Sequence, residues 1–184
     1  TDFADPLYRQ INQVRILSKV GIPEGTNPIN FNTASVFDEE AFNINFFTPS
    51  NEYWVTRERT RLGKKLFYDN ILSGTKTRNC SSCHLPEKAF TDGLKTSIAI
   101  DNKTLLLRNS PTLLNAGFQT KFFYDSRVSI LEGQLNAVIH NEEEMKGSLA
   151  ENVNDLKKIQ SYVDLFQKAY PNEPDPLTAY TIIN

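Results

Sequence analysis

One short motif, Cys80-Ser81-Ser82-Cys83-His84, constrains the fold of this chain more than any other feature of its sequence. Two thiols at this spacing can add to the two vinyl groups along one porphyrin edge, and the adjacent His84 can bind the iron. The chain has 2 cysteines and 2 histidines, so the motif uses both cysteines and one histidine. It therefore predicts covalently attached haem c.

Other uses of a C-x-x-C motif fit the sequence less well. A thioredoxin-like pair needs a preceding strand, but residues 73–79 form a polar loop in which no strand is predicted. A structural zinc site needs four ligands, and His140 is the one further Cys or His in the chain. A disulfide between Cys80 and Cys83 would close a very small loop and add little stability.

Length, net charge and hydropathy limit the size of the core, the kinds of partner and the cellular location. At 184 residues the chain can bury one core, and its net charge of −2 with no basic run makes nucleic acid and anionic membranes poor partners. Neither a transmembrane span nor a signal peptide is visible. Because bacterial haem attachment takes place outside the cytoplasm, we expect a periplasmic protein whose export signal is not part of this sequence.

The local patterns predict a mainly α-helical chain in two parts, residues 1–55 and 56–184. The first part reads as loop-rich because of turn signals at residues 21–23, 25–28 and 48–50. In the second part, Leu62, Leu66 and Phe67 mark the apolar stripe of a helix. Further helices are predicted from Ser110-Pro111 to Gly117, from capping boxes at Ser129 and Ser148, through Val163, Phe166 and Tyr170, and from Asp175-Pro176 onward.

Several polar residues could face the haem. Gln134 falls within the apolar stripe of the helix predicted after Ser129, where an amide bonded to backbone is the simpler reading. Within residues 140–145, a carboxylate near haem could move a proton between the oxygens of bound peroxide. His140 or Met145 could instead be a sixth haem ligand in an electron carrier. Spacing alone does not rank these options.

A series of ordered motifs closely resembles the N-terminal, peroxidatic haem domain of the bacterial dihaem cytochrome c peroxidases, a family that includes the enzyme maturing methylamine dehydrogenase. The match runs from about residue 57 to the end and includes, besides the haem motif, residues 62–69, 89–93, 108–115 and 124–127. The resemblance implies a cytochrome c-like domain after the N-terminal extension. It further implies an oxidoreductase that reduces hydrogen peroxide with electrons from a small cytochrome or copper protein.

The resemblance also assigns residues to roles. His84 matches the proximal ligand, and Gln134 and Glu144 match the distal pair that handles peroxide. Arg127 falls in a stretch near the haems, and Asn109 matches a residue that helps to bind calcium between two haem domains. A second haem domain and a homodimer are further partners that the family pattern implies, although this chain has no second C-x-x-C-H motif.

Two departures from the family pattern affect the expected reaction. Tyr124 stands where many members have a tryptophan between the haems, which leaves open an oxidase acting on a protein or organic substrate, as in the maturation branch. Residues 97–101 lack the histidine that caps the resting iron in many members. We therefore expect a haem open to peroxide without prior reduction, and a bis-histidine spectrum of the oxidised protein would contradict this.

Overall fold

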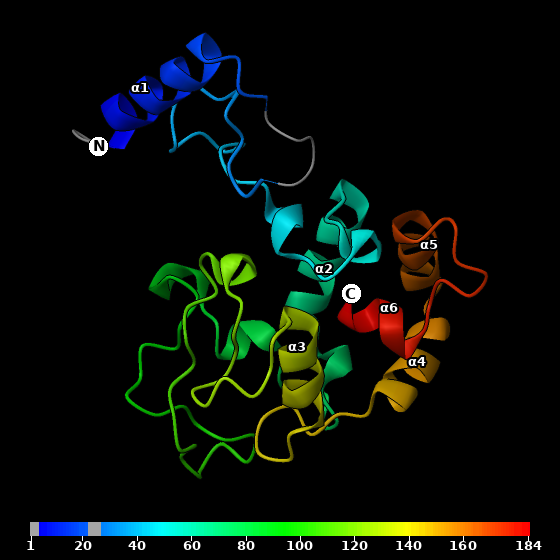
Figure 1. The fold of residues 1–184 in the computed structure, drawn as a ribbon. Coiled ribbons are helices and arrows are strands. Elements are labelled where there is room, and N and C mark those ends of the chain that lie inside the picture. The colour runs from blue at the N-terminus through cyan, green and yellow to red at the C-terminus, as the bar shows by residue number, and fades with distance from the viewer. Residues whose placement is uncertain (1–3, 22–26) are drawn as a thin grey trace. The chain divides into compact units, whose positions relative to one another are not determined.

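The computed structural model describes residues 4–21 and 27–184, and the chain divides into two compact units, Thr1–Trp54 and Val55–Asn184. Extended structure in the described part is limited to isolated bridges, which agrees with the all-α prediction. None of the described helices has the length and apolarity needed to span a membrane. The α-helices are α1 (Ala4–Leu17), α2 (Arg57–Tyr68), α3 (Leu131–His140), α4 (Leu149–Lys157), α5 (Gln160–Ala169) and α6 (Ala179–Ile183) (Figure 1).

Helix α1 was not predicted, because the first unit was expected to be loop-rich. Its anchor is Tyr8, which is 7% exposed and donates to the carbonyl of Asn30 at 2.9 Å. At the start of the helix, the Ser35 hydroxyl donates to Asp5 at 2.7 Å. Tertiary contacts thus stabilise a helix whose sequence carries no strong boundary signal. Most of the turn signals expected between residues 21 and 28 lie outside the described residues.

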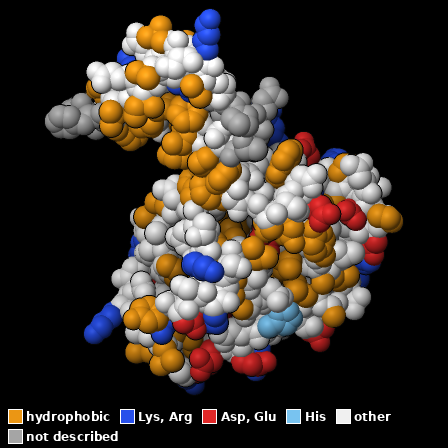
Figure 2. Space-filling view, in the orientation of Figure 1, with side chains coloured by type: hydrophobic (Ala, Val, Ile, Leu, Met, Phe, Trp, Pro, Cys, Tyr) orange, Lys and Arg blue, Asp and Glu red, His pale blue; other side chains and the backbone are white. Residues whose placement is uncertain are grey.

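The core of the second unit lies between α2, α4, α5 and α6, with α3 beside them (Figure 1). Leu156 and Phe166 are fully buried there, and Tyr162 donates to Asp69 at 2.7 Å. Loops that include the haem motif cover the other side of α3 (Figure 1). Basic and acidic side chains are interspersed over the visible face, consistent with the small net charge (Figure 2).

The structure confirms some predicted helix starts and corrects others. Thr56 and Ser148 cap α2 and α4 with their hydroxyls. The helix predicted from Ser110 does not form, because its hydroxyl pairs with Ser97 at 2.9 Å instead of capping. The Ser129 box is also wrong: Ile130 is the N-cap of α3, and it makes no side-chain cap bond.

Two further boundaries differ from the predicted ones. Because Val128 is held in a bridge to Phe122, α3 begins only at Leu131. The last helix starts at Ala179 and not at Asp175, whose carboxylate binds Lys157 at 2.7 Å. A backbone bridge and a side-chain ion pair, both made with other parts of the chain, therefore accompany these later helix starts.

Two glycines allow the segment before the haem motif to lie directly against the turn after α3. Gly74 donates its N–H to the Met145 carbonyl at 3.0 Å, and Gly147 donates to Ile139 at 2.7 Å. A Cβ on Gly74 would collide with the backbone of Lys146, and one on Gly147 with the Leu72 carbonyl. This close backbone approach holds residues 141–147 beside the segment that leads to Cys80.

Candidate functional site

The haem motif begins with a single 3-10 turn, Cys80–Ser82, capped by Asn79. The Asn79 side chain accepts from the Ser82 N–H at 3.1 Å, and the Ser82 hydroxyl accepts from the Asn79 N–H at 3.2 Å. Cys80 and Cys83 are free, half-buried thiols. Burial raises the pKa of Cys80 to about 11 and also raises that of Cys83, so both are protonated thiols at neutral pH.

His84 is fixed so that one ring nitrogen is free. Its Nδ1 lies 2.9 Å from the carbonyl oxygen of Phe90. A carbonyl can only accept, so Nδ1 must carry the proton and Nε2 presents its lone pair. The carbonyl is held in place by a turn in which Ala89 and Phe90 adopt left-handed φ angles of 53° and 59°. A carbonyl that accepts from the nitrogen not bound to metal orients a metal-binding histidine.

These residues fit a covalently bound haem c. Two unpaired thiols at the required spacing precede an imidazole whose Nε2 is free and whose Nδ1 is anchored. Cys80 and Cys83 would hold the porphyrin edge, and His84 would bind the iron. Among the residues that the structure describes, no cluster of three or more His, Cys, Asp or Glu side chains could hold a metal ion by itself.

Glu144 lies in the turn that follows α3 and is half-buried. Asn141 donates its Nδ2–H to Glu144 Oε1 at 2.8 Å, while Asn141 Oδ1 accepts from the Glu143 N–H at 2.9 Å. Burial raises the pKa of the Glu144 carboxyl, and the charges of Arg127 and Arg78 oppose that rise. The same carboxylate raises the pKa of the Cys83 thiol, so the turn lies within electrostatic reach of the haem motif.

The other polar candidates near Glu144 face different surroundings. Met145 is 5% exposed and packs in the hydrophobic core. His140 is exposed, with Nδ1 at 2.9 Å from the Asn136 carbonyl of its own helix. Gln134 is half-buried on α3, and the structure records no hydrogen bond from its amide to the described residues. The backbone-bonded reading of Gln134 is thus not what the structure shows.

The remaining candidates lie on exposed loops. Tyr124 is 84% exposed, and the Arg108 guanidinium lies 4.2 Å from its ring centroid. Arg127 pairs with Asp125 at 2.8 Å and covers the Phe123 ring at 3.7 Å.

Asn109 is also exposed, and no carboxylate cluster accompanies it in the described part of the chain. The structure thus brings Cys80, Cys83 and His84 together, with Glu144 and Arg127 in electrostatic contact. It gives no such link for Tyr124 or Asn109.

Two contributors were missed by sequence reasoning. Arg78 was read as part of a polar loop, but it is 8% exposed. Ser110 was read as a helix cap, but its hydroxyl forms a hydrogen bond that lowers the pKa of Cys83. Neither residue has a periodic signal that could have identified it, because both sit in irregular segments.

The fold and the site define an all-α domain of the c-type haem class. The sequence profile of the di-haem cytochrome c peroxidases matches residues 57–184, so the chain belongs to that family. The chain is 34% identical over 125 residues to the methylamine utilization protein MauG of Methylorubrum extorquens, covering 68% of this chain and 35% of the relative. It is 34% identical over 124 residues to the cytochrome c551 peroxidase of Pseudomonas aeruginosa, covering 67% and 36%.

A solved structure extends the likeness to three dimensions. The crystal structure of a MauG-like protein associated with microbial copper homeostasis matches with a TM-score of 0.68 at 33% identity, covering 73% of this chain and 40% of that one. The chain thus spans about a third of the length of the curated relatives it matches. The comparisons therefore establish the family to which the chain belongs.

Proposed function

We propose that this domain forms the peroxide-reducing haem site of a periplasmic cytochrome c peroxidase. The reaction takes hydrogen peroxide, two electrons and two protons to two molecules of water, with electrons from a small cytochrome or copper protein. When bound, the haem supplies the iron through which electrons reach peroxide. The family membership and the free Nε2 of His84 support this proposal.

The observation that carries the peroxidase function is the half-buried Glu144 carboxyl, in a turn that is hydrogen-bonded through Met145 to Gly74, on the segment that leads to Cys80. Peroxide cleavage requires a proton to move from one oxygen to the other, and a carboxyl of raised pKa accepts and returns a proton near neutral pH more readily than an ordinary one. Asn141 holds Oε1 and leaves Oε2 available. Gln134, whose amide has no hydrogen-bond partner among the described residues, would donate a hydrogen bond to peroxide.

The electron-carrier alternative is less well supported. Met145 is buried in the hydrophobic core, which does not favour it as a haem ligand. His140 bonds through Nδ1 to its own helix, as His84 does to Phe90, so this contact alone does not exclude it, and family membership favours the peroxidase. A second enzyme function, oxidation of a protein or organic substrate, is favoured by one observation, the 84% exposure of Tyr124 beside Arg108. A second haem domain, a homodimer and a calcium ion near Asn109 remain part of the proposal through family resemblance.

Replacement of Glu144 tests the proposed function directly. In the haem-loaded protein, Glu144→Gln keeps the side-chain size but removes the proton acceptor. We expect peroxide turnover to fall about 100-fold, the scale of one preorganised polar group in an active site. Glu142→Gln, which changes an exposed residue of the same turn, is the matched control and should leave turnover unchanged. Equal turnover of Glu144→Gln and the wild type would show that Glu144 has no such role.

A further inference from the structure

Arg78, two residues before Cys80, is a buried cation held by backbone. Its Nη1 donates to the Ile98 carbonyl at 2.9 Å, and its Nη2 donates to the Ala99 carbonyl at 2.7 Å and to Asn102 Oδ1 at 3.3 Å. The described residues form no salt bridge with it. A buried guanidinium without a carboxylate partner needs such acceptors to offset its loss of hydration. These hydrogen bonds therefore fix both the Arg78 side chain and the residues that accept from it.

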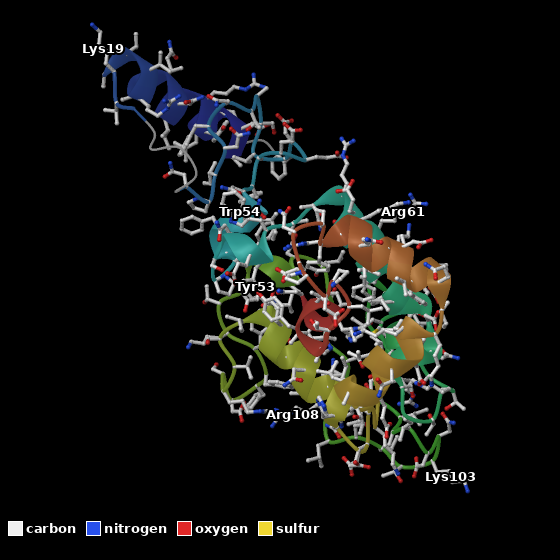
Figure 3. All side chains as sticks on the ribbon, turned by 90° about the vertical axis from the view of Figure 1, so that its right-hand side faces the viewer. Lys19, Tyr53, Trp54, Arg61, Lys103 and Arg108 are labelled. Atoms are coloured by element: carbon white, nitrogen blue, oxygen red, sulfur yellow. The ribbon has the colours of Figure 1, made fainter. Side chains whose placement is uncertain are left out.

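The acceptors belong to a tight hairpin formed by residues 97–106. Leu106 donates its N–H to the Ser97 carbonyl at 2.8 Å, and Ala99 donates to Thr104 at 2.8 Å. Asp101 closes the turn by accepting from the Thr104 N–H at 2.8 Å. Lys103 lies at the edge of the unit (Figure 3), whereas Arg78 is 8% exposed.

The hairpin contacts the site at two places. The Ile100 N–H donates to the Glu143 carbonyl at 2.8 Å, next to Glu144. The Ser97 hydroxyl lies 2.9 Å from that of Ser110, which in turn is hydrogen-bonded to Cys83. The hairpin therefore connects the turn that carries Glu144 with the Cys83 thiol.

We propose that Arg78 is a positioning residue that clamps the 97–106 hairpin and thereby holds the turn carrying Glu144 beside the haem motif. The role of Glu144 rests on the proposed function, but the clamp does not. Electrostatics add a second effect. Of the charged groups around the Glu144 carboxyl, Arg127 and Arg78 lower its pKa and Glu143 raises it, while the Asn141 amide also lowers it.

Hydrogen exchange of the haem-loaded protein distinguishes loss of the Arg78 clamp from loss of the whole fold. Arg78→Lys keeps the charge but removes the planar fork of donors. We expect the amides of residues 97–106 to exchange about tenfold faster than in the wild type, the scale of one lost charge-assisted hydrogen bond. Arg61→Lys, at an exposed position of α2 (Figure 3), is the matched control and should exchange like the wild type. Unchanged exchange in Arg78→Lys would overturn the clamp.

The pH dependence of peroxide turnover distinguishes positioning from general destabilisation. Arg78→Gln removes the cation as well, so the acid limb should move to higher pH, whereas Arg78→Lys should keep it near the wild-type position. An acid limb unmoved in both variants would overturn the link to Glu144.

A milder variant tests the clamp even if the Arg78 variants fail to fold. Asn102→Ala removes one acceptor and should raise exchange in the same segment by a smaller factor. Unchanged exchange there, with an Arg78 variant that fails to fold, would count against the clamp. Lack of turnover in the wild-type protein would contradict the proposed function, while the exchange comparison would still test the clamp.

Discussion

Glu144 shows how one residue's surroundings set its chemistry. Its neighbours Glu142 and Glu143 are exposed, and Met145 is buried in the core. Within four positions, the turn after α3 therefore directs side chains to solvent, to a half-buried position and to the core. Sequence alone left these residues unranked, because a polar run carries no periodicity. Family resemblance selected Glu144, and the Asn141 hydrogen bond at 2.8 Å gives that choice a physical basis.

The raised pKa of Glu144 predicts a definite pH dependence. A proton acceptor works in its ionised form, so turnover should fall as pH drops through a pKa above the ordinary glutamate value of about 4.3. The native state binds this proton more tightly than the unfolded chain. The contribution of Glu144 to stability is therefore lost as pH rises from the unfolded to the native pKa. A pH profile of kcat/KM whose acid limb persists in Glu144→Gln would contradict the assignment.

His84 was predictable in identity but not in orientation. The C-x-x-C-H spacing determines which imidazole adjoins the thiols, yet nothing in the motif indicates that the Phe90 carbonyl holds Nδ1 at 2.9 Å. That contact depends on two consecutive left-handed residues, Ala89 and Phe90, neither of which is glycine. Because residues other than glycine rarely adopt left-handed backbone angles, the sequence did not predict this turn.

At the scale of elements, helices with a strong amphipathic stripe were predicted best. Helix α2 forms where its apolar stripe was predicted, and it buries Leu62 and Leu66. The expected helix at Ser110 failed because that hydroxyl bonds to Ser97, a partner distant in sequence. A cap motif is a local signal, and a tertiary hydrogen bond can replace it.

The contact between residues 72–74 and 145–147 predicts unequal effects of two glycine substitutions. Gly74→Ala places a methyl group against the Lys146 backbone and should lower the free energy of unfolding by about 1–3 kcal/mol. Gly63→Ala, in α2 with open space around it, should raise that free energy by about 0.5–1 kcal/mol. Thermal or urea unfolding of both variants measures the difference. A Gly74→Ala protein as stable as the wild type would argue against this close contact.

For the whole molecule, the sequence predicted the helical fold class but not the helix of the first unit. Helix α1 has apolar residues at helical spacing, but the turn signals that follow it led to the prediction of a loop-rich segment. The hairpin of residues 97–106 was also missed, because its bonds join backbone groups and a buried arginine. Irregular segments held by tertiary contacts are the part of this site that local patterns do not encode.

The central claim is that Cys80, Cys83 and His84 form a covalent haem c site. Intact mass of the protein, expressed with a haem-attachment system and denatured before measurement, tests it most directly. We predict the mass of the polypeptide plus one haem, retained after acid extraction, with double attachment lost in Cys80→Ala and in Cys83→Ala. A polypeptide mass without haem, or a haem removed by acid extraction, would contradict the account.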